Sequence, residues 1–218
     1  NFGWETHGLY ESAAFQALGD PDAAAAILRE NRIRYILLNQ VIGSVDDDRA
    51  IAEFGLKTGK LRVAAAGGYS LHRSMWYRLL VKDGAAYESG GNFFPALGTY
   101  RLVYESATTY LYPDTGEVSH FKIFEFLPGA RMEGRGAPGA TVELELSLNS
   151  PIGRVFTYRD RGFVGADGRF SLRVPYATVA SSGILKPLGD YLVSIGGRRF
   201  PVRVTEDDVY RGKQVVVP

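Results

Sequence analysis

The stretch that decides the fold runs from Phe121-Lys-Ile-Phe-Glu-Phe126 into Pro128-Gly-Ala-Arg-Met-Glu-Gly134. Its first part has the apolar, β-rich composition of a strand, and Pro128-Gly129 interrupts it. Helix-like and strand-like segments are mixed before this point, whereas the segments after it have strand patterns. The sequence therefore predicts an α+β protein, with a mixed α/β core unit at 1–127 and a small antiparallel β-sandwich at 128–218.

The first unit opens with two helix patterns and a strand pattern. Residues 8–18 space their apolar side chains like a helix that stops at Gly19. Asp20-Pro21 then supplies an N-cap and a first-turn proline for a helix over 22–31, and the apolar run 33–38 predicts a buried strand. The later patterns predict helices at 46–54 and 72–81, turns at 83–84 and 113–116, a loop at 90–92, and strands at 100–104 and 119–126.

The second unit has short strand patterns separated by turns. Residues 141–148 alternate apolar and polar side chains with a period of two, which is typical of a strand with one buried face. Asp167-Gly168 predicts a hairpin between Phe163-Val164 and Phe170. Five further strands are expected at 152–158, 169–174, 190–195, 198–204 and 213–217.

Composition and charge exclude several kinds of partner and site. The 218 residues are 45% hydrophobic and 22% charged, as in an ordinary globular protein, and the net charge of +1 gives no reason to expect a nucleic-acid partner. There is no cysteine, which excludes disulfides and thiolate sites. No run approaches the roughly 20 apolar residues of a membrane span. Because the chain begins at Asn1-Phe-Gly-Trp4 without Met, we interpret it as an excised fragment or a mature domain.

No motif in the chain predicts a catalytic centre. Gly55-Leu-Lys-Thr-Gly-Lys60 is one residue short of a phosphate-binding loop and has Leu61 where a serine or threonine is needed. His7, His72 and His120 lack the spacing of a metal site. The sequence also lacks the Gly-x-Ser-x-Gly pattern of a serine hydrolase. These observations favour a binding or supporting module.

Several segments, taken in order, resemble the single-subunit catalytic protein of oligosaccharyltransferase found in archaea and bacteria. The resemblance spans nearly the whole chain, and its segments are individually short. They are Asp20 to Leu38, Lys57-Thr-Gly-Lys60, Met75 to Gly84, Tyr100-Arg-Leu-Val-Tyr-Glu-Ser106, Lys122-Ile-Phe-Glu-Phe-Leu-Pro-Gly-Ala-Arg-Met-Glu-Gly134, Gly139 to Val142, Phe156-Thr-Tyr158 and Val174-Pro-Tyr-Ala-Thr178.

The resemblance implies that the chain is the soluble C-terminal, extracytoplasmic domain of a membrane-anchored glycosyltransferase. Members of that family transfer a lipid-linked oligosaccharide to the asparagine of an acceptor sequon. The divalent metal, Mn or Mg, and the acidic residues that hold it belong to the membrane part. This fragment is therefore expected to bind no cofactor and to be inactive alone, contributing acceptor positioning and structural support. Its implied partners are the acceptor peptide, the transmembrane domain of the same chain and, through that domain, the lipid-linked oligosaccharide.

The family holds the acceptor in a pocket that carries a WWDYG motif, which this sequence lacks. A second pocket element has the pattern Asp-x-x-Lys-x-x-x-Met/Ile. Lys60 matches its lysine, while Lys57 stands in place of the Asp and Ala64 in place of the Met or Ile. The resemblance therefore gives Lys60 as a candidate acceptor-binding residue. Trp4 and His7 are further candidates, because they would follow the missing motif.

Two other functions remain open from the sequence. The first is a stand-alone carbohydrate- or peptide-binding module that uses the β-sandwich as a stacking platform. The second is the soluble domain of another lipid-sugar-dependent membrane glycosyltransferase whose acceptor is not a protein. The sequence encoded upstream of Asn1 would distinguish them.

Overall fold

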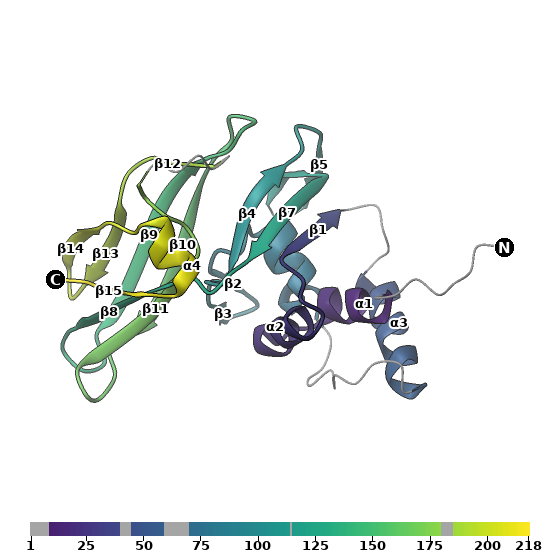
Figure 1. The fold of residues 1–218 in the computed structure, drawn as a ribbon, viewed down its shortest axis with the longest axis horizontal. Helices are drawn as coiled ribbons and strands as arrows, with labels where there is room; N and C mark the ends of the chain where they lie inside the picture. Colours follow the sequence, from purple (N-terminus) through teal and green to yellow (C-terminus); the bar gives the residue numbers. More distant parts are fainter. Residues whose placement is uncertain (1–8, 40–44, 59–69, 114, 180–184) are drawn as a thin grey trace.

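A computed structural model describes residues 9–39, 45–58, 70–113, 115–179 and 185–218. It confirms the α+β class. Figure 1 shows the helices of the first part gathered at one end of the molecule and a β-rich unit at the other, with a small sheet between them.

The first three helices form where the sequence predicted them. Helix α1 spans Leu9–Ala17, α2 spans Pro21–Glu30 and α3 spans Val45–Lys57. Asp20 caps α2, because its carboxylate accepts a hydrogen bond of 2.9 Å from the backbone N–H of Asp22. The start of α2 is therefore fixed by its own sequence.

The helix predicted at 72–81 is helical but not a regular α-helix. It begins as a 3-10 turn, η1 (Leu71–Arg73), and ends as a π-turn, η2 (Tyr77–Val81). In the π-turn, hydrogen bonds reach five residues back, as from the N–H of Lys82 to the carbonyl of Tyr77 at 3.1 Å. All five residues of the π-turn are buried, and Leu79 has 0% exposure.

A three-stranded antiparallel sheet forms the centre of the first unit. Its order is β1 (Tyr35–Asn39), β7 (Phe121–Phe126) and β4 (Tyr100–Glu105). Buried apolar side chains lie two positions apart in β1 (Ile36 and Leu38) and in β4 (Tyr100 and Leu102), and they pack with Phe124 and the helices into one hydrophobic cluster. One face of the sheet is thereby covered.

The prediction that 33–38 is a buried strand is wrong in its burial, and the strand lies at 35–39. β1 is an edge strand of this sheet, and its exposure alternates. Tyr35 is 55% exposed and Leu37 is 60% exposed, whereas Ile36 and Leu38 are buried. An antiparallel strand needs only one buried face, so an apolar run does not by itself indicate a strand covered on both faces.

Two small hairpins project from the first unit. They are β2 (Tyr87–Ser89) with β3 (Asn92–Phe94), and β5 (Thr109–Tyr112) with β6 (Gly116–Ser119). The loop predicted at 90–92 is a two-residue hairpin turn, in which Gly90 and Gly91 have φ of 57° and 75°. Both glycines are required by this turn, because it needs positive φ at its two central positions.

The second unit consists of two sheets packed face to face. The larger sheet has the order β10-β9-β13-β14, with β12 paired to β9, and the smaller sheet has the order β11-β8-β15. Their strands are β8 (Ala130–Arg135), β9 (Thr141–Asn149), β10 (Val155–Phe163), β11 (Arg169–Val174), β12 (Lys186–Pro187), β13 (Tyr191–Ile195), β14 (Arg198–Val202) and β15 (Gln214–Val216).

Three details of this unit differ from the sequence predictions. The turn at Asp167-Gly168 joins β10 of one sheet to β11 of the other, so it does not form the predicted hairpin. β15 runs parallel to β8. A short helix, α4 (Glu206–Arg211), precedes β15; its N-terminus is capped by Thr205 and Asp208, and Gly212 ends it.

The two units have separate hydrophobic clusters that meet at one junction. One cluster lies within the first part of the chain, the other begins at Leu127, and Phe156 and Leu185 pack against both. Backbones approach closely here: a Cβ on Gly98 would lie 2.2 Å from the carbonyl oxygen of Arg173. The division of the chain between residues 127 and 128 remains a prediction.

We expect Gly98→Ala to destabilise the protein by about 1–3 kcal/mol, because the added methyl group would overlap backbone atoms at the junction. The measurement is urea unfolding. Gly19→Ala is the matched control, since its Cβ would lie 3.4 Å from the nearest atom, Cβ of Arg73. Equal free energies of unfolding for the two variants would contradict the tight junction.

Candidate functional site

The structure does not test the three candidate residues taken from the sequence. Lys60, Trp4 and His7 all lie outside the described residues. The described residues instead bring together a set of charged side chains at the junction between the two units, which the sequence analysis did not single out. We call this set the junction network.

The junction network is built on the ladder between β4 and β7. Arg101 lies opposite Glu125 near one end of the ladder, and Glu105 lies opposite Lys122 near the other. Opposite charges facing each other across two strands attract, so each pair supports the register of the ladder. The second unit then adds its own charged residue to each pair.

The Glu105–Lys122 pair extends into a buried cluster. Lys122, whose side chain is 2% exposed, donates to Asp83 at 2.6 Å and to the carbonyl of Leu80 at 2.7 Å. Arg154, from the loop before β10, donates to Asp83 at 2.9 Å and to Glu105 at 2.6 Å. Two cations and two carboxylates therefore neutralise one another where water has little access.

The ionised state of this cluster follows from its contacts. Burial by itself would raise the pKa of Asp83, but the charges of Lys122 and Arg154 outweigh it and hold the pKa below its ordinary value. Burial likewise opposes the charge of Arg154, yet Asp83 and Glu105 raise the pKa of its guanidinium. Asp83 and Arg154 are therefore both charged near neutral pH.

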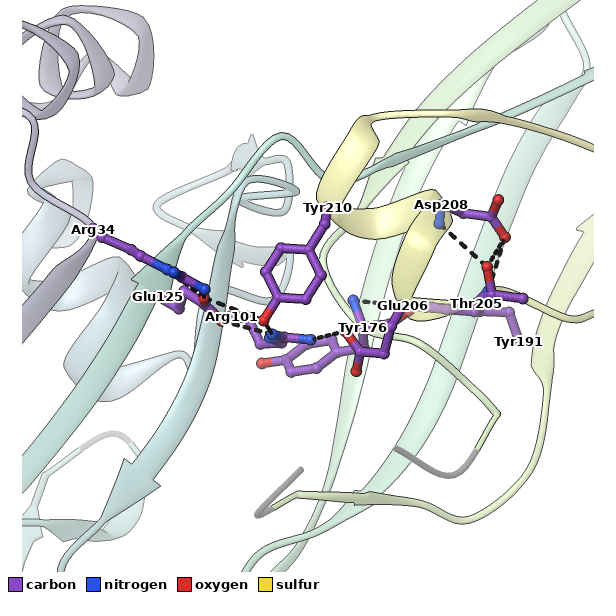
Figure 2. A network of polar contacts seen from close by, with 9 residues as sticks. All are labelled: Arg34, Arg101, Glu125, Tyr176, Tyr191, Thr205, Glu206, Asp208 and Tyr210. Carbon is purple, nitrogen blue, oxygen red and sulfur yellow. Dashed lines mark hydrogen bonds and ion pairs between the residues drawn. The ribbon is translucent and has the colours of Figure 1, made fainter. Parts of the chain in front are cut away.

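The Arg101–Glu125 pair is joined to α4, as Figure 2 shows. Arg101 donates to Glu125 at 2.6 Å, to Glu206 at 2.7 Å and to the hydroxyl of Tyr210 at 2.6 Å. Arg34, from the turn before β1, donates to the other oxygen of Glu125 at 2.7 Å. Glu125 thus accepts from two arginines, and α4 is held against the outer face of the first sheet.

A bulge in β4 provides a further contact between the units. The register shifts between Leu102 and Tyr104, and the backbone N–H of Leu102 donates to the hydroxyl of Tyr176 at 3.1 Å. Tyr176 lies after β11 in the second unit, and its backbone is in turn bonded to the hydroxyl of Tyr191. Both tyrosines are buried.

The sequence contained a signal for this network. Lys122 and Glu125 interrupt an otherwise apolar strand, and both lie within segments that carry the family resemblance, as do Arg101, Glu105 and Asp83. A charged residue at a position that the strand pattern buries requires a partner. The partner could not be identified from the sequence, because Arg154 and Glu206 are distant along the chain.

The network has the chemistry of a structural junction. Its carboxylates are occupied by arginine and lysine, so they are not placed to abstract a proton from a substrate. In the part of the chain that the structure describes, no group of three or more His, Cys, Asp or Glu side chains is arranged to hold a metal ion. No helix among the described segments has the length and apolar character needed to cross a bilayer.

We expect Lys122→Met to lower the free energy of unfolding by about 3 kcal/mol, because it leaves buried carboxylates undercompensated. Chemical denaturation measures this loss. Glu53→Gln is the control: it removes the exposed Arg49–Glu53 pair of α3 and should change the stability by less than about 0.5 kcal/mol. A loss for Lys122→Met no greater than the control would show that the buried cluster does not stabilise the fold.

The network also predicts loss of stability in acid. Burial opposes the charge of Glu125, but hydrogen bonds from Arg101 and Arg34 lower its pKa, as the cluster lowers that of Asp83. A carboxyl group whose pKa is lowered by folding stabilises the fold at pH values above its pKa in the unfolded protein, about 4. That stabilisation is lost as the pH falls through the pKa of the group in the folded protein. The urea concentration at the unfolding midpoint should therefore fall once the pH is below about 4. It should fall less steeply with pH for the Glu125→Gln variant. Identical pH profiles would contradict this assignment.

Comparison with known proteins identifies what this fold resembles. Residues 129–215 match the family model for the archaeal glycosylation protein B long peripheral domain. A curated relative, the dolichyl-monophosphooligosaccharide–protein glycotransferase AglB of Haloferax volcanii, is 26% identical over 144 residues, which cover 64% of this chain and 14% of that protein. The match thus includes only a small part of the relative.

The fold is also that of solved structures. The Archaeoglobus fulgidus oligosaccharyltransferase in complex with Zn and sulfate aligns over 94% of this chain with a TM-score of 0.73 at 15% identity, covering 35% of that protein. AglB from the same organism, in complex with an inhibitory peptide and a dolichol-phosphate, aligns over 94% with a TM-score of 0.72 at 15% identity, covering 32%. The chain therefore spans about a third of these structures.

The matches in sequence and in fold confirm the resemblance noted from the sequence segments. Residues 129–215 match the long peripheral domain of archaeal glycosylation protein B, and 94% of the chain shares the fold of the Archaeoglobus fulgidus oligosaccharyltransferase.

Proposed function

We propose that the chain is the extracytoplasmic domain of a membrane enzyme that transfers a lipid-linked oligosaccharide to the asparagine of an acceptor sequon. The observation that carries this proposal is that one alignment to a solved oligosaccharyltransferase covers 94% of the chain. That alignment includes both the mixed unit and the β-sandwich. The chemistry of transfer belongs to the rest of the enzyme.

The first contribution of the chain is structural support. The junction network, the Tyr176 contact and the glycine contact at Gly98 fix the β-sandwich against the mixed unit at several separate points. Interdomain interfaces that are small and exposed permit relative motion, whereas buried charged contacts constrain it. The two units therefore act as one rigid body behind the acceptor site.

The second contribution is positioning of the acceptor peptide by Lys60, with Trp4 and His7 as further contacts. Lys60 follows α3 three positions later in the sequence, and α3 packs against α1. The proposal is supported by a solved relative of the same fold, the Archaeoglobus fulgidus enzyme, which is tethered to an acceptor peptide containing an NVT sequon. An ammonium group can donate hydrogen bonds to a peptide carbonyl or hydroxyl.

The divalent metal implied by the family would be held by the membrane part. The described residues of this chain do not supply a ligand group for it. The related structure with Zn supports a metal in the whole enzyme. We therefore assign the metal no ligand among the residues described.

The test is N-glycosylation of a fluorescent sequon peptide by membranes that contain the full-length protein, supplied with a lipid-linked donor. Glycopeptide should form with the full-length protein and be lost when residues 1–218 are deleted. A well-folded full-length protein that makes no glycopeptide would overturn the proposal. It would favour a lipid-sugar-dependent enzyme with a different acceptor.

In the same assay, Lys60→Ala should raise the KM for the acceptor peptide by about tenfold, because a hydrogen bond from a charged donor is lost. The kcat at saturating peptide should change much less if Lys60 only binds the acceptor. Lys186→Ala is the matched control, since Lys186 is exposed on β12 of the second unit. Equal effects of the two variants would exclude a specific role for Lys60.

A further inference from the structure

The outer face of the smaller sheet, β11-β8-β15, carries an unusual arrangement of charge. Arg169 on β11 lies directly opposite Arg135 on β8, and Arg173 lies directly opposite Arg131. All four side chains are exposed. Within the described parts of the chain, none of the four forms an ion pair with a carboxylate. We call this surface the arginine face.

Such an arrangement opposes the stability of the sheet. Side chains directly opposite on neighbouring antiparallel strands are close enough to interact, and like charges in that position repel. Glu133 is the acidic side chain between the two pairs on the same face, and it lies opposite Ser171 and Val216. Four arginines and one glutamate leave the face strongly positive. The repulsion would be relieved by a bound anion.

The face also has a hollow at the Arg135–Arg169 end. Its volume is about 500 Å³, and its lining includes Arg135, Arg169, Glu133, Gln214 and Val216. Guanidinium groups present paired N–H donors that match the oxygens of a phosphate, and the four cations are all arginine. Arg135 and Arg169 both line the hollow, so a phosphate group bound there would lie beside two guanidinium groups.

An exposed apolar residue lies beside these charges. Val216 on β15 is 69% exposed, and it is paired with Glu133 on the arginine face. Positive charge together with exposed apolar side chains is typical of surfaces that lie on a bilayer, where phosphates are the outer layer and hydrocarbon is beneath them. A soluble polyanion would gain nothing from the valine.

We propose that the arginine face docks on the phosphate headgroups of an anionic membrane surface and so orients the β-sandwich toward the bilayer. The inference rests on the membrane location proposed above. It adds a second attachment of the domain to the membrane, separate from the transmembrane segments. Its strength depends on headgroup charge and on salt, because the charges are exposed to solvent.

The experiment is flotation of the purified 218-residue chain with vesicles of neutral phosphatidylcholine, or of phosphatidylcholine mixed with phosphatidylglycerol. The chain should bind the vesicles that contain phosphatidylglycerol, and added salt should release it. The double variant Arg135→Gln, Arg169→Gln should bind about 25-fold more weakly, since each arginine near an anionic surface contributes about fivefold.

The matched control is Arg159→Gln, Arg199→Gln. Both of these arginines are exposed on the outer face of the larger sheet, so the net charge changes equally while the arginine face stays intact. This control should bind like the unmodified chain. The thermal midpoint of the Arg135, Arg169 variant should be unchanged or higher, because it relieves a like-charge contact. If the variant binds the vesicles more weakly and is still folded, unfolding cannot explain the weaker binding.

Three results would overturn the proposal. They are equal binding to neutral and anionic vesicles, equal losses for the variant and its control, and binding to dextran sulfate in solution without binding to vesicles. The last would point to a soluble polyanion as the partner. Because flotation uses neither sequon peptide nor donor, its failure would leave the glycosylation result of the proposed function unaffected.

Discussion

The cluster of Lys122, Asp83, Arg154 and Glu105 is the interaction on which the rest of the structure depends. It joins the π-turn of the first unit, the ladder between β4 and β7, and the loop that leads into β10 of the second unit. Burying charge is expensive, and the expense is offset only if every charge has its partners. The cluster is therefore stable in only one relative position of the two units. Hydrophobic contacts alone would fix that position less strictly.

The second charged contact has a different character. Arg34 is 59% exposed where it meets Glu125, and Arg101 connects that carboxylate to α4. The exposed Arg34 adds little to stability, whereas the Arg101–Glu125 pair, with side chains 13% and 2% exposed, stabilises the fold and also sets orientation. Together with the Tyr176 hydroxyl on the β4 bulge, it holds the second unit against the outer face of the first sheet. The proposed role in positioning an acceptor peptide would benefit from such rigidity.

Local sequence signals predicted much of the fold. The Asp20 cap placed the start of α2, Gly90-Gly91 placed a loop, and the alternation over 141–148 placed β9. These features depend on neighbours within a few residues. The hairpin predicted at Asp167-Gly168 was wrong because a turn sequence does not determine which strands pair. The helix α4 was missed because its one-turn pattern, with Thr205 and Asp208 at its start, lies among strand patterns.

The sequence by itself determined the class of the protein, its two kinds of structural pattern and its resemblance to a known family, because local periodicity and short ordered segments are properties of the chain. The tertiary structure alone decided which charges meet. Arg154 reaches Asp83 across 71 positions, Arg101 reaches Glu206 across 105, and Arg135 faces Arg169 because β8 and β11 share a sheet. Such contacts depend on chain topology, and no local pattern encodes the distance between residues so far apart.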